Sequence, residues 1–136
     1  MARSAVQLVR TLDYKLHPQA PQWAGFEFMI GTHGRKAVGQ LGIEIVDDTS
    51  GSIVRTRSLE LDDITDNEIV QIDFDEIYDS KDKYFTAQFS LKVFDSKTTI
   101  SIYEENETES KGKHILRRLG LLTRGNTLAC RLLYSQ

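Results

Sequence analysis

Apolar side chains alternate with polar ones over much of this chain, and this period of two constrains the fold more than any other feature. The longest alternation spans residues 84–93, where every second residue is apolar. Those residues are Phe85, Ala87, Phe89, Leu91 and Val93. Successive side chains of a β-strand point to opposite faces, so such a segment has one apolar and one polar face. We therefore expect a strand whose sheet packs on one face and meets water on the other.

The same alternation returns in five further segments, and no window of eleven or more residues follows the 3.6-residue period of an amphipathic helix. The segments are 24–30, 40–46, 68–75, 100–102 and 128–132. Turn sequences rich in Gly, Asp, Asn and Ser separate them, at 31–34, 47–51, 62–67, 79–82 and 124–126. This rhythm predicts an all-β fold, an antiparallel β-sandwich that is jelly-roll-like and has about nine strands.

Length and charge narrow the class of protein. At 136 residues the chain is expected to form one domain over 1–136, excised from or attached to a larger chain. The net charge is −3, and the densest basic stretch, Lys111–Arg124, is interleaved with Leu and Gly as in a strand and turn. A nucleic-acid binder concentrates positive charge on one face, so we expect no nucleic-acid partner. No apolar run has the length of a membrane-spanning helix, so we expect a soluble fragment without direct membrane insertion.

A long polar stretch, residues 104–113, is expected to be a mobile loop between strands. The single cysteine, Cys130, excludes an internal disulfide. It lies in the alternating segment 128–132, so we interpret it as a thiol of the core and not as a nucleophile.

Catalysis needs a nucleophile or base held by an orienting partner, and the sequence offers no such arrangement. The three histidines are isolated from one another: His17 stands beside Pro18, His33 lies in a glycine turn, and His114 begins a strand. No histidine pair has the spacing of metal ligands, and a single cysteine cannot build a thiolate zinc site. We expect no catalytic residues and no metal ligands, with a small β-sandwich hydrolase or lyase as a weaker alternative.

The aspartates in the predicted turns leave a structural calcium ion as the one cofactor to consider. Seven aspartates fall in predicted turns, where hard cations find oxygen ligands: Asp47, Asp48, Asp62, Asp63, Asp66, Asp79 and Asp82. No segment has the spaced pattern of a calcium-binding loop, and turn aspartates commonly cap backbone amides. We therefore expect no cofactor and keep a structural calcium ion as the alternative.

Sugar recognition by β-sandwiches uses exposed aromatic rings together with polar side chains that pair with hydroxyl groups. Aromatic residues out of phase with the core, or in loops, are Tyr14, Trp23, Tyr78 and Tyr103. The candidate ligand-binding residues are Tyr14, Trp23, His33 and Arg35. Trp23 could equally close one end of the sandwich, and Arg35 could equally pair with a turn aspartate.

Several segments together resemble a β-sandwich accessory module of bacterial cell-envelope and polysaccharide glycosyltransferases and related membrane proteins. They are residues 26–35, 39–47, 61–67, 70–74 and 74–85. The last, Phe-Asp-Glu-Ile-Tyr-Asp-Ser-Lys-Asp-Lys-Tyr-Phe, is the most specific. It is similar to a family pattern Phe-x-Pro-Ile-x-Asp-Ser-x-Gly-Lys-x-Tyr. The likeness covers about residues 5–134.

Three departures from the family pattern bear on its interpretation. Glu76 stands where the family has proline, Asp82 where it has glycine, and His33 where it has tyrosine. The first two lie in turns and should leave the fold intact. The third puts in doubt any binding role of the Gly34-Arg35 turn. Asp79, Ser80 and Lys83 are expected chiefly to shape their turn, with Tyr84 opening the next strand.

The resemblance implies a jelly-roll-like sandwich without enzymatic activity, which binds carbohydrate beside a glycosyltransferase catalytic domain. Under this hypothesis, Trp23→Ala should weaken glycan retention and leave the melting temperature nearly unchanged. The alternative is a protein-interaction or structural docking module without glycan binding, which should expose a contiguous apolar patch larger than about 400 Å².

Overall fold

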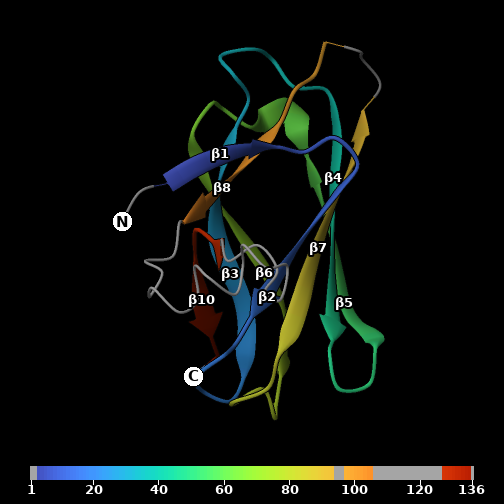
Figure 1. Cartoon of the computed structure of the whole chain (residues 1–136), viewed down its shortest axis with the longest axis vertical. Helices are drawn as coiled ribbons and strands as arrows, with labels where there is room; N and C mark the ends of the chain where they lie inside the picture. The colour runs from blue at the N-terminus through green and yellow to red at the C-terminus, as the bar shows by residue number, and fades with distance from the viewer. Residues whose placement is uncertain (1–2, 94–96, 106–126, 136) are drawn as a thin grey trace, which may run out of the picture.

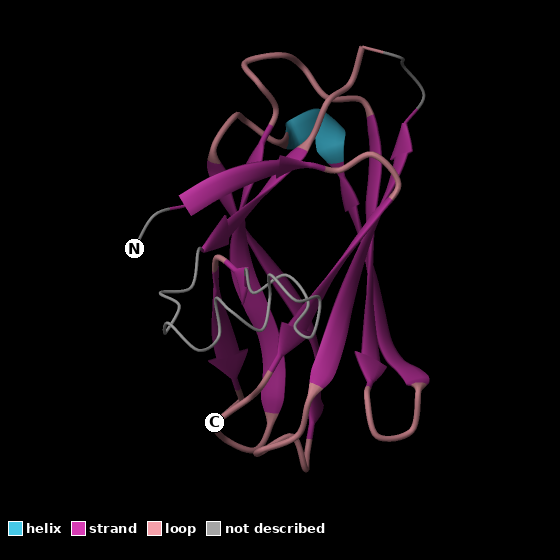
Figure 2. Cartoon of the chain, in the orientation of Figure 1, coloured by secondary structure: helices cyan, strands magenta, loops and turns pink. Residues whose placement is uncertain are grey.

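The computed structural model describes residues 3–93, 97–105 and 127–135. These residues form ten strands and one 3-10 helix, and none of them lies in an α-helix (Figure 1, Figure 2). In chain order the elements are β1 (Arg3–Gln7), β2 (Thr11–Leu16), β3 (Trp23–Gly31), β4 (Gly39–Asp47), β5 (Ser52–Glu60), η1 (Leu61–Asp63), β6 (Glu68–Ile77), β7 (Phe85–Val93), β8 (Ser101–Glu105), β9 (Thr127–Leu128) and β10 (Cys130–Tyr134). The all-β prediction is confirmed. The described residues hold ten strands, not about nine, and the last alternating segment, 128–132, divides at Ala129 into β9 and β10.

The strands form two antiparallel sheets. One has four strands in the order β2-β7-β4-β5. The other has six, with the path β1-β8-β3-β10, while β6 pairs with β3 and β9 pairs with β8. Strand β5 therefore forms an edge of the first sheet, and β6 forms an edge of the second. The antiparallel β-sandwich is confirmed, and its jelly-roll-like character stays a prediction.

The core lies between the two sheets and consists of the alternating residues that the sequence indicates. Strand β3 contributes Phe26, Phe28 and Ile30, and β4 and β7 contribute buried residues with the same period. The ring of Phe89 in β7 meets Phe28 in β3 edge-on, with centroids 5.1 Å apart. Contacts of this kind join the sheets and bury large apolar side chains, at about 1.5–3 kcal/mol of stabilisation each. The alternation of β7 continues beyond the core, since Val93 is exposed.

The connections gather at two ends of the sandwich (Figure 1). We call the Tyr84 end the one formed by the β2–β3, β4–β5 and β6–β7 connections, where the described chain also ends. Backbone hydrogen bonds tie these connections together, from Asp48 N–H to the Tyr84 carbonyl (3.1 Å) and from Asp82 N–H to the Pro18 carbonyl (3.0 Å). We call the His33 end the opposite one, which holds the β3–β4 and β5–β6 connections.

Some predicted loops differ from the structure. The segment 62–67 begins inside η1 (Leu61–Asp63) and becomes a turn only afterwards. Glu104 and Glu105 belong to strand β8, so the polar stretch predicted as a loop from residue 104 begins later than expected. The rest of that stretch, the basic segment 111–124, His114 and the turn 124–126 lie outside the described residues.

Candidate functional site

Trp23 does not offer its ring to solvent. It is the first residue of β3 and is fully buried. Its indole N–H donates to the carbonyl of Gly25 (2.6 Å), and its ring packs against Phe74 and Phe85, with centroids 5.0 and 5.1 Å away. The expectation of a surface platform at Trp23 is wrong. The other interpretation, a ring that closes one end of the sandwich, agrees with this burial.

Tyr14 is also buried, although it was expected to be out of phase with the core. Its hydroxyl donates to Oε2 of Glu104 (2.6 Å), and Glu104 is itself buried. Because Tyr14 lies in β2 and Glu104 in β8, this bond joins the two sheets. A ring held between the sheets cannot stack on a glycan at the surface, so this candidate is corrected as well.

His33 and Arg35 lie at the opposite end of the molecule from Trp23. The His33 ring shares a 2.7 Å hydrogen bond between Nε2 and the Ser101 hydroxyl, and its backbone has a left-handed φ of 59°. The Arg35 side chain is exposed and forms no ion pair with any residue of the described ranges. The predicted pairing of Arg35 with a turn aspartate is therefore not found there.

The two turns at the His33 end are held together by one carboxylate. Asp66 accepts hydrogen bonds from the backbone N–H groups of Thr32 (2.7 Å), His33 (3.2 Å) and Gly34 (3.0 Å). Three donors on one carboxylate leave this turn without free amides for a ligand. The structure thus separates the four predicted residues, with only His33 and Arg35 near each other.

The β6–β7 connection at the Tyr84 end is built around a buried serine. Ser80 is fully buried, and its hydroxyl accepts from the Trp23 N–H (3.0 Å) and donates to the Ala20 carbonyl (3.0 Å). The exposed Asp79 pairs with Lys83 at 2.8 Å, and this hydrogen bond, followed by the charge attraction, lowers the pKa of Asp79. The turn therefore has the shaping role that the sequence suggested for Asp79, Ser80 and Lys83.

Asp82, in the same connection, has a backbone conformation that most residues avoid. Its φ is 62°, in the left-handed region that glycine adopts without strain and aspartate tolerates better than most residues.

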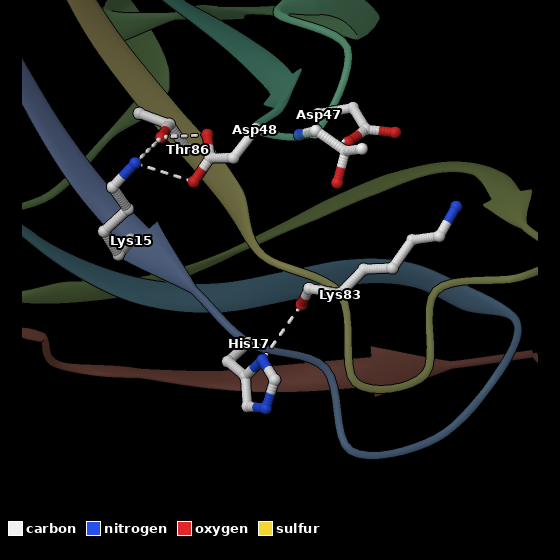
Figure 3. A network of polar contacts seen from close by, with 7 residues as sticks. Lys15, His17, Asp47, Asp48, Lys83 and Thr86 are labelled. Carbon is white, nitrogen blue, oxygen red and sulfur yellow. Dashed lines mark hydrogen bonds and ion pairs between the residues drawn. The ribbon is translucent and has the colours of Figure 1, made fainter.

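The feature that the sequence did not predict is a stacked ring pair at the Tyr84 end. The rings of His17 and Tyr84 lie with centroids 4.1 Å apart and planes 20° from parallel. His17 also uses Nδ1 to donate to the Lys83 carbonyl (3.0 Å), as Figure 3 shows. Tyr84 is 56% exposed, so much of this residue remains open to solvent beside the His17 ring.

A charged network lies near His17, as Figure 3 shows. Lys15 Nζ donates to Asp48 Oδ2 (2.6 Å) and to Thr86 Oγ1 (3.1 Å), and Thr86 donates to Asp48 Oδ1 (2.7 Å). Both carboxylate oxygens of Asp48 are thereby occupied. The same residue's backbone N–H binds the Tyr84 carbonyl, so the network fixes the backbone that carries the exposed ring.

A second tyrosine of the same connection, Tyr78, is 76% exposed. Its carbonyl accepts from the Gln22 N–H (3.3 Å), which ties it to the β2–β3 connection. We call the Tyr84 surface the set His17, Tyr78, Tyr84 and the charged residues Lys15, Asp48, Asp79 and Lys83. The period-two pattern could not find it, because its members come from three connections and strand ends far apart in the sequence.

Four of the seven turn aspartates bind the protein's own backbone or side chains. Asp47 caps the Thr49 N–H (2.9 Å), Asp66 caps the β3–β4 turn, and Asp48 and Asp79 pair with lysines. Within residues 3–93, 97–105 and 127–135, no three His, Cys, Asp or Glu side chains come together as a metal site. These contacts agree with the capping interpretation of the turn aspartates.

No protein-family model, curated protein or solved structure matches this chain. Over the described part of the chain, no helix has the length and apolar character needed to span a membrane.

Proposed function

We propose that this chain is a non-catalytic carbohydrate-binding-like module, which binds a glycan at the Tyr84 surface. The observation that carries the proposal is the stacked pair of His17 and Tyr84. A tyrosine ring that is 56% exposed at a loop end, and supported on one side by an imidazole, offers a flat apolar face to a sugar ring.

The ring pair is preorganised for such a contact. Tyr84 is held by the His17 ring and by the backbone bond from Asp48, so little side-chain freedom is lost on binding. The lysines and aspartates around it supply donors and acceptors for hydroxyl groups. In a non-catalytic module these groups orient the ligand and make no covalent change in it.

We further propose that the module serves bacterial cell-surface polysaccharide synthesis beside a glycosyltransferase catalytic domain. The support is the sequence resemblance described above, whose most specific segment, 74–85, contains both exposed tyrosines of the Tyr84 surface. The family pattern leaves position 84 unspecified, so the assignment of Tyr84 as the binding ring rests on its exposure and its contact with His17.

Isothermal titration calorimetry against a panel of bacterial surface glycans tests the proposal. Tyr84→Ala should weaken binding about tenfold or more, since an aromatic hot-spot residue commonly carries about 2 kcal/mol or more of a binding free energy. Ile69→Ala, at an exposed position of β6 outside the surface, serves as control and should bind like the natural chain. Trp23 fluorescence is a poor reporter here, because that ring is buried far from solvent.

The docking alternative has one specific observation in its favour. Ile69 is 62% exposed on the edge strand β6 and lines, with Met29, a cavity of about 140 Å³ on the outer face of the six-stranded sheet. The Arg131–Glu27 ion pair (2.8 Å) lies beside it. Failure of every glycan to bind the natural chain would overturn the carbohydrate proposal. Binding that is equal in Tyr84→Ala and the natural chain would overturn the assignment of the site.

A further inference from the structure

A second concave site lies at the opening between the two sheets, away from the Tyr84 surface. Strand β5 is an edge of one sheet and β6 an edge of the other, and between them is a cleft of about 430 Å³. This volume is within the range of about 300–1,000 Å³ that is usual for small-molecule sites. The residues that line it are Arg55, Thr56, Arg57, Asp73, Phe74 and Asp75.

Arg55 fixes the width of the cleft. Its guanidinium donates across the opening to the backbone carbonyls of Asp75 (Nε, 2.7 Å) and Glu76 (Nη2, 2.9 Å), and to that of Val54 in its own strand (Nη1, 2.6 Å). A guanidinium has five N–H groups, so these three bonds leave two for a ligand. The bonds also satisfy carbonyl groups on the edge of β6, where a second chain could otherwise pair.

The charges of the cleft balance, with Arg55 and Arg57 on one wall and Asp73 and Asp75 on the other. The side chain of Arg57 is exposed and forms no ion pair with a residue of the described ranges. An anionic ligand would be attracted by the arginines and repelled by the aspartates. A hydroxyl group can donate to a carboxylate and accept from a guanidinium, so a neutral polyhydroxylated ligand can use both walls.

Phe74 adds an apolar element to this polar lining. It is partly buried, and its ring meets the buried Trp23 ring edge-on, with planes 90° apart. The contact with the core holds the Phe74 ring in one orientation. Phe74 lies on the opposite face of β6 from Asp73 and Asp75, so a saccharide at this strand edge can place C–H groups on the ring and hydroxyls on the polar groups.

We propose that the β5–β6 cleft is a second binding site, for a neutral saccharide. Arg57 donates to its hydroxyl groups, Asp73 and Asp75 accept from them, and Phe74 contacts the apolar face of a sugar ring. The site shares no residue with the Tyr84 surface, so the two proposals can be tested independently.

NMR titration of the ¹⁵N-labelled chain tests the cleft, with maltotriose, cellotriose and mannotriose as neutral probes and trigalacturonic acid as the anionic one. We expect at least one neutral trisaccharide to shift the amide signals of residues 55–57 and 73–75 saturably, with a Kd below about 10 mM. Arg57→Gln removes the charge and should weaken this binding about tenfold. Tyr84→Ala, at the other surface, should leave it unchanged, and urea unfolding confirms that Arg57→Gln is as stable as the natural chain.

Three results would overturn the inference: no saturable shift at these amides with any neutral probe, equal affinity in Arg57→Gln and the natural chain, or a response to trigalacturonic acid alone. Shifts at residues 78–84 that are lost in Tyr84→Ala and kept in Arg57→Gln report on the Tyr84 surface. The experiment can therefore refute the proposal for one site and support the proposal for the other.

Discussion

The buried hydroxyl of Ser80 accepts a hydrogen bond from the backbone N–H of Trp23, 57 positions earlier in the chain. The same hydroxyl donates to the Ala20 carbonyl. One small side chain thus joins the β2–β3 connection, the start of β3 and the β6–β7 connection. It fixes the turn that presents Tyr84 and, at the same time, the depth at which Trp23 enters the core.

Ser80→Ala should therefore destabilise the fold although it removes a single oxygen atom. It leaves the buried Trp23 N–H without its partner, at about 1–3 kcal/mol, and the half-buried Ala20 carbonyl also loses its donor. The exposed Ser58→Ala should change stability by less than about 0.5 kcal/mol. Urea unfolding followed by circular dichroism measures both. Equal midpoints for the two variants would contradict the role of Ser80.

Trp23→Ala should lower the free energy of unfolding by about 3–5 kcal/mol, because it opens a cavity among Phe26, Phe74 and Phe85. The matched change Tyr84→Ala removes a ring that is largely exposed and should cost less than about 1 kcal/mol. Thermal unfolding compares the two variants. A melting temperature unchanged by Trp23→Ala would show that the ring is not part of the core.

Asp66→Ala should destabilise the His33 end by about 1–3 kcal/mol, since three backbone N–H groups lose a charged acceptor. Asp66→Asn keeps one side-chain oxygen and should therefore reduce the stability of this end by less than Asp66→Ala does. Hydrogen exchange gives a local readout, with faster exchange expected at Thr32 and Gly34. Protection at these amides that survives Asp66→Ala would refute the bonds.

Cys130 should react slowly with alkylating reagents in the folded chain. Burial, and then the negative charge of Glu105, raise the pKa of its thiol to about 11. The thiolate is the reactive form, so at pH 8 alkylation by iodoacetamide should be about tenfold or more slower than in urea. Mass spectrometry over time measures both rates. Equal rates in the folded and unfolded chain would contradict the raised pKa.

The exposed Asp79–Lys83 pair should appear in the titration of Asp79. The lowered pKa means that the folded state binds this proton less tightly than the unfolded state. Any stabilisation is then present above the ordinary aspartate pKa and is lost as the pH falls through the lowered one. Lys83→Met should raise the pKa of Asp79 toward its ordinary value, measured by NMR of the carboxyl carbon. Lys81→Met, next to the same turn, should leave it unchanged.

Part of the candidate site could be predicted from local sequence. The turn 79–82 and the strand that follows it are visible in the pattern, and the resemblance assigns a turn-shaping role to Asp79, Ser80 and Lys83. The exposure of single aromatic rings could not be predicted in this way. Trp23 follows a proline-containing loop and Tyr84 directly precedes strand β7, yet the first is buried and the second is exposed. Burial depends on what the rest of the chain places over a residue.

The sequence by itself determined the all-β class, the position of most strands and, for those strands, the side that faces the core. It could do so because the alternation of side chains along a strand is a property of neighbouring residues. Only the tertiary structure decided which turns meet. His17 lies on Tyr84, and Asp66 caps the turn at Thr32–Gly34, because the order of strands in the two sheets brings together segments more than thirty positions apart. Such pairings rest on long-range packing, which no local pattern encodes.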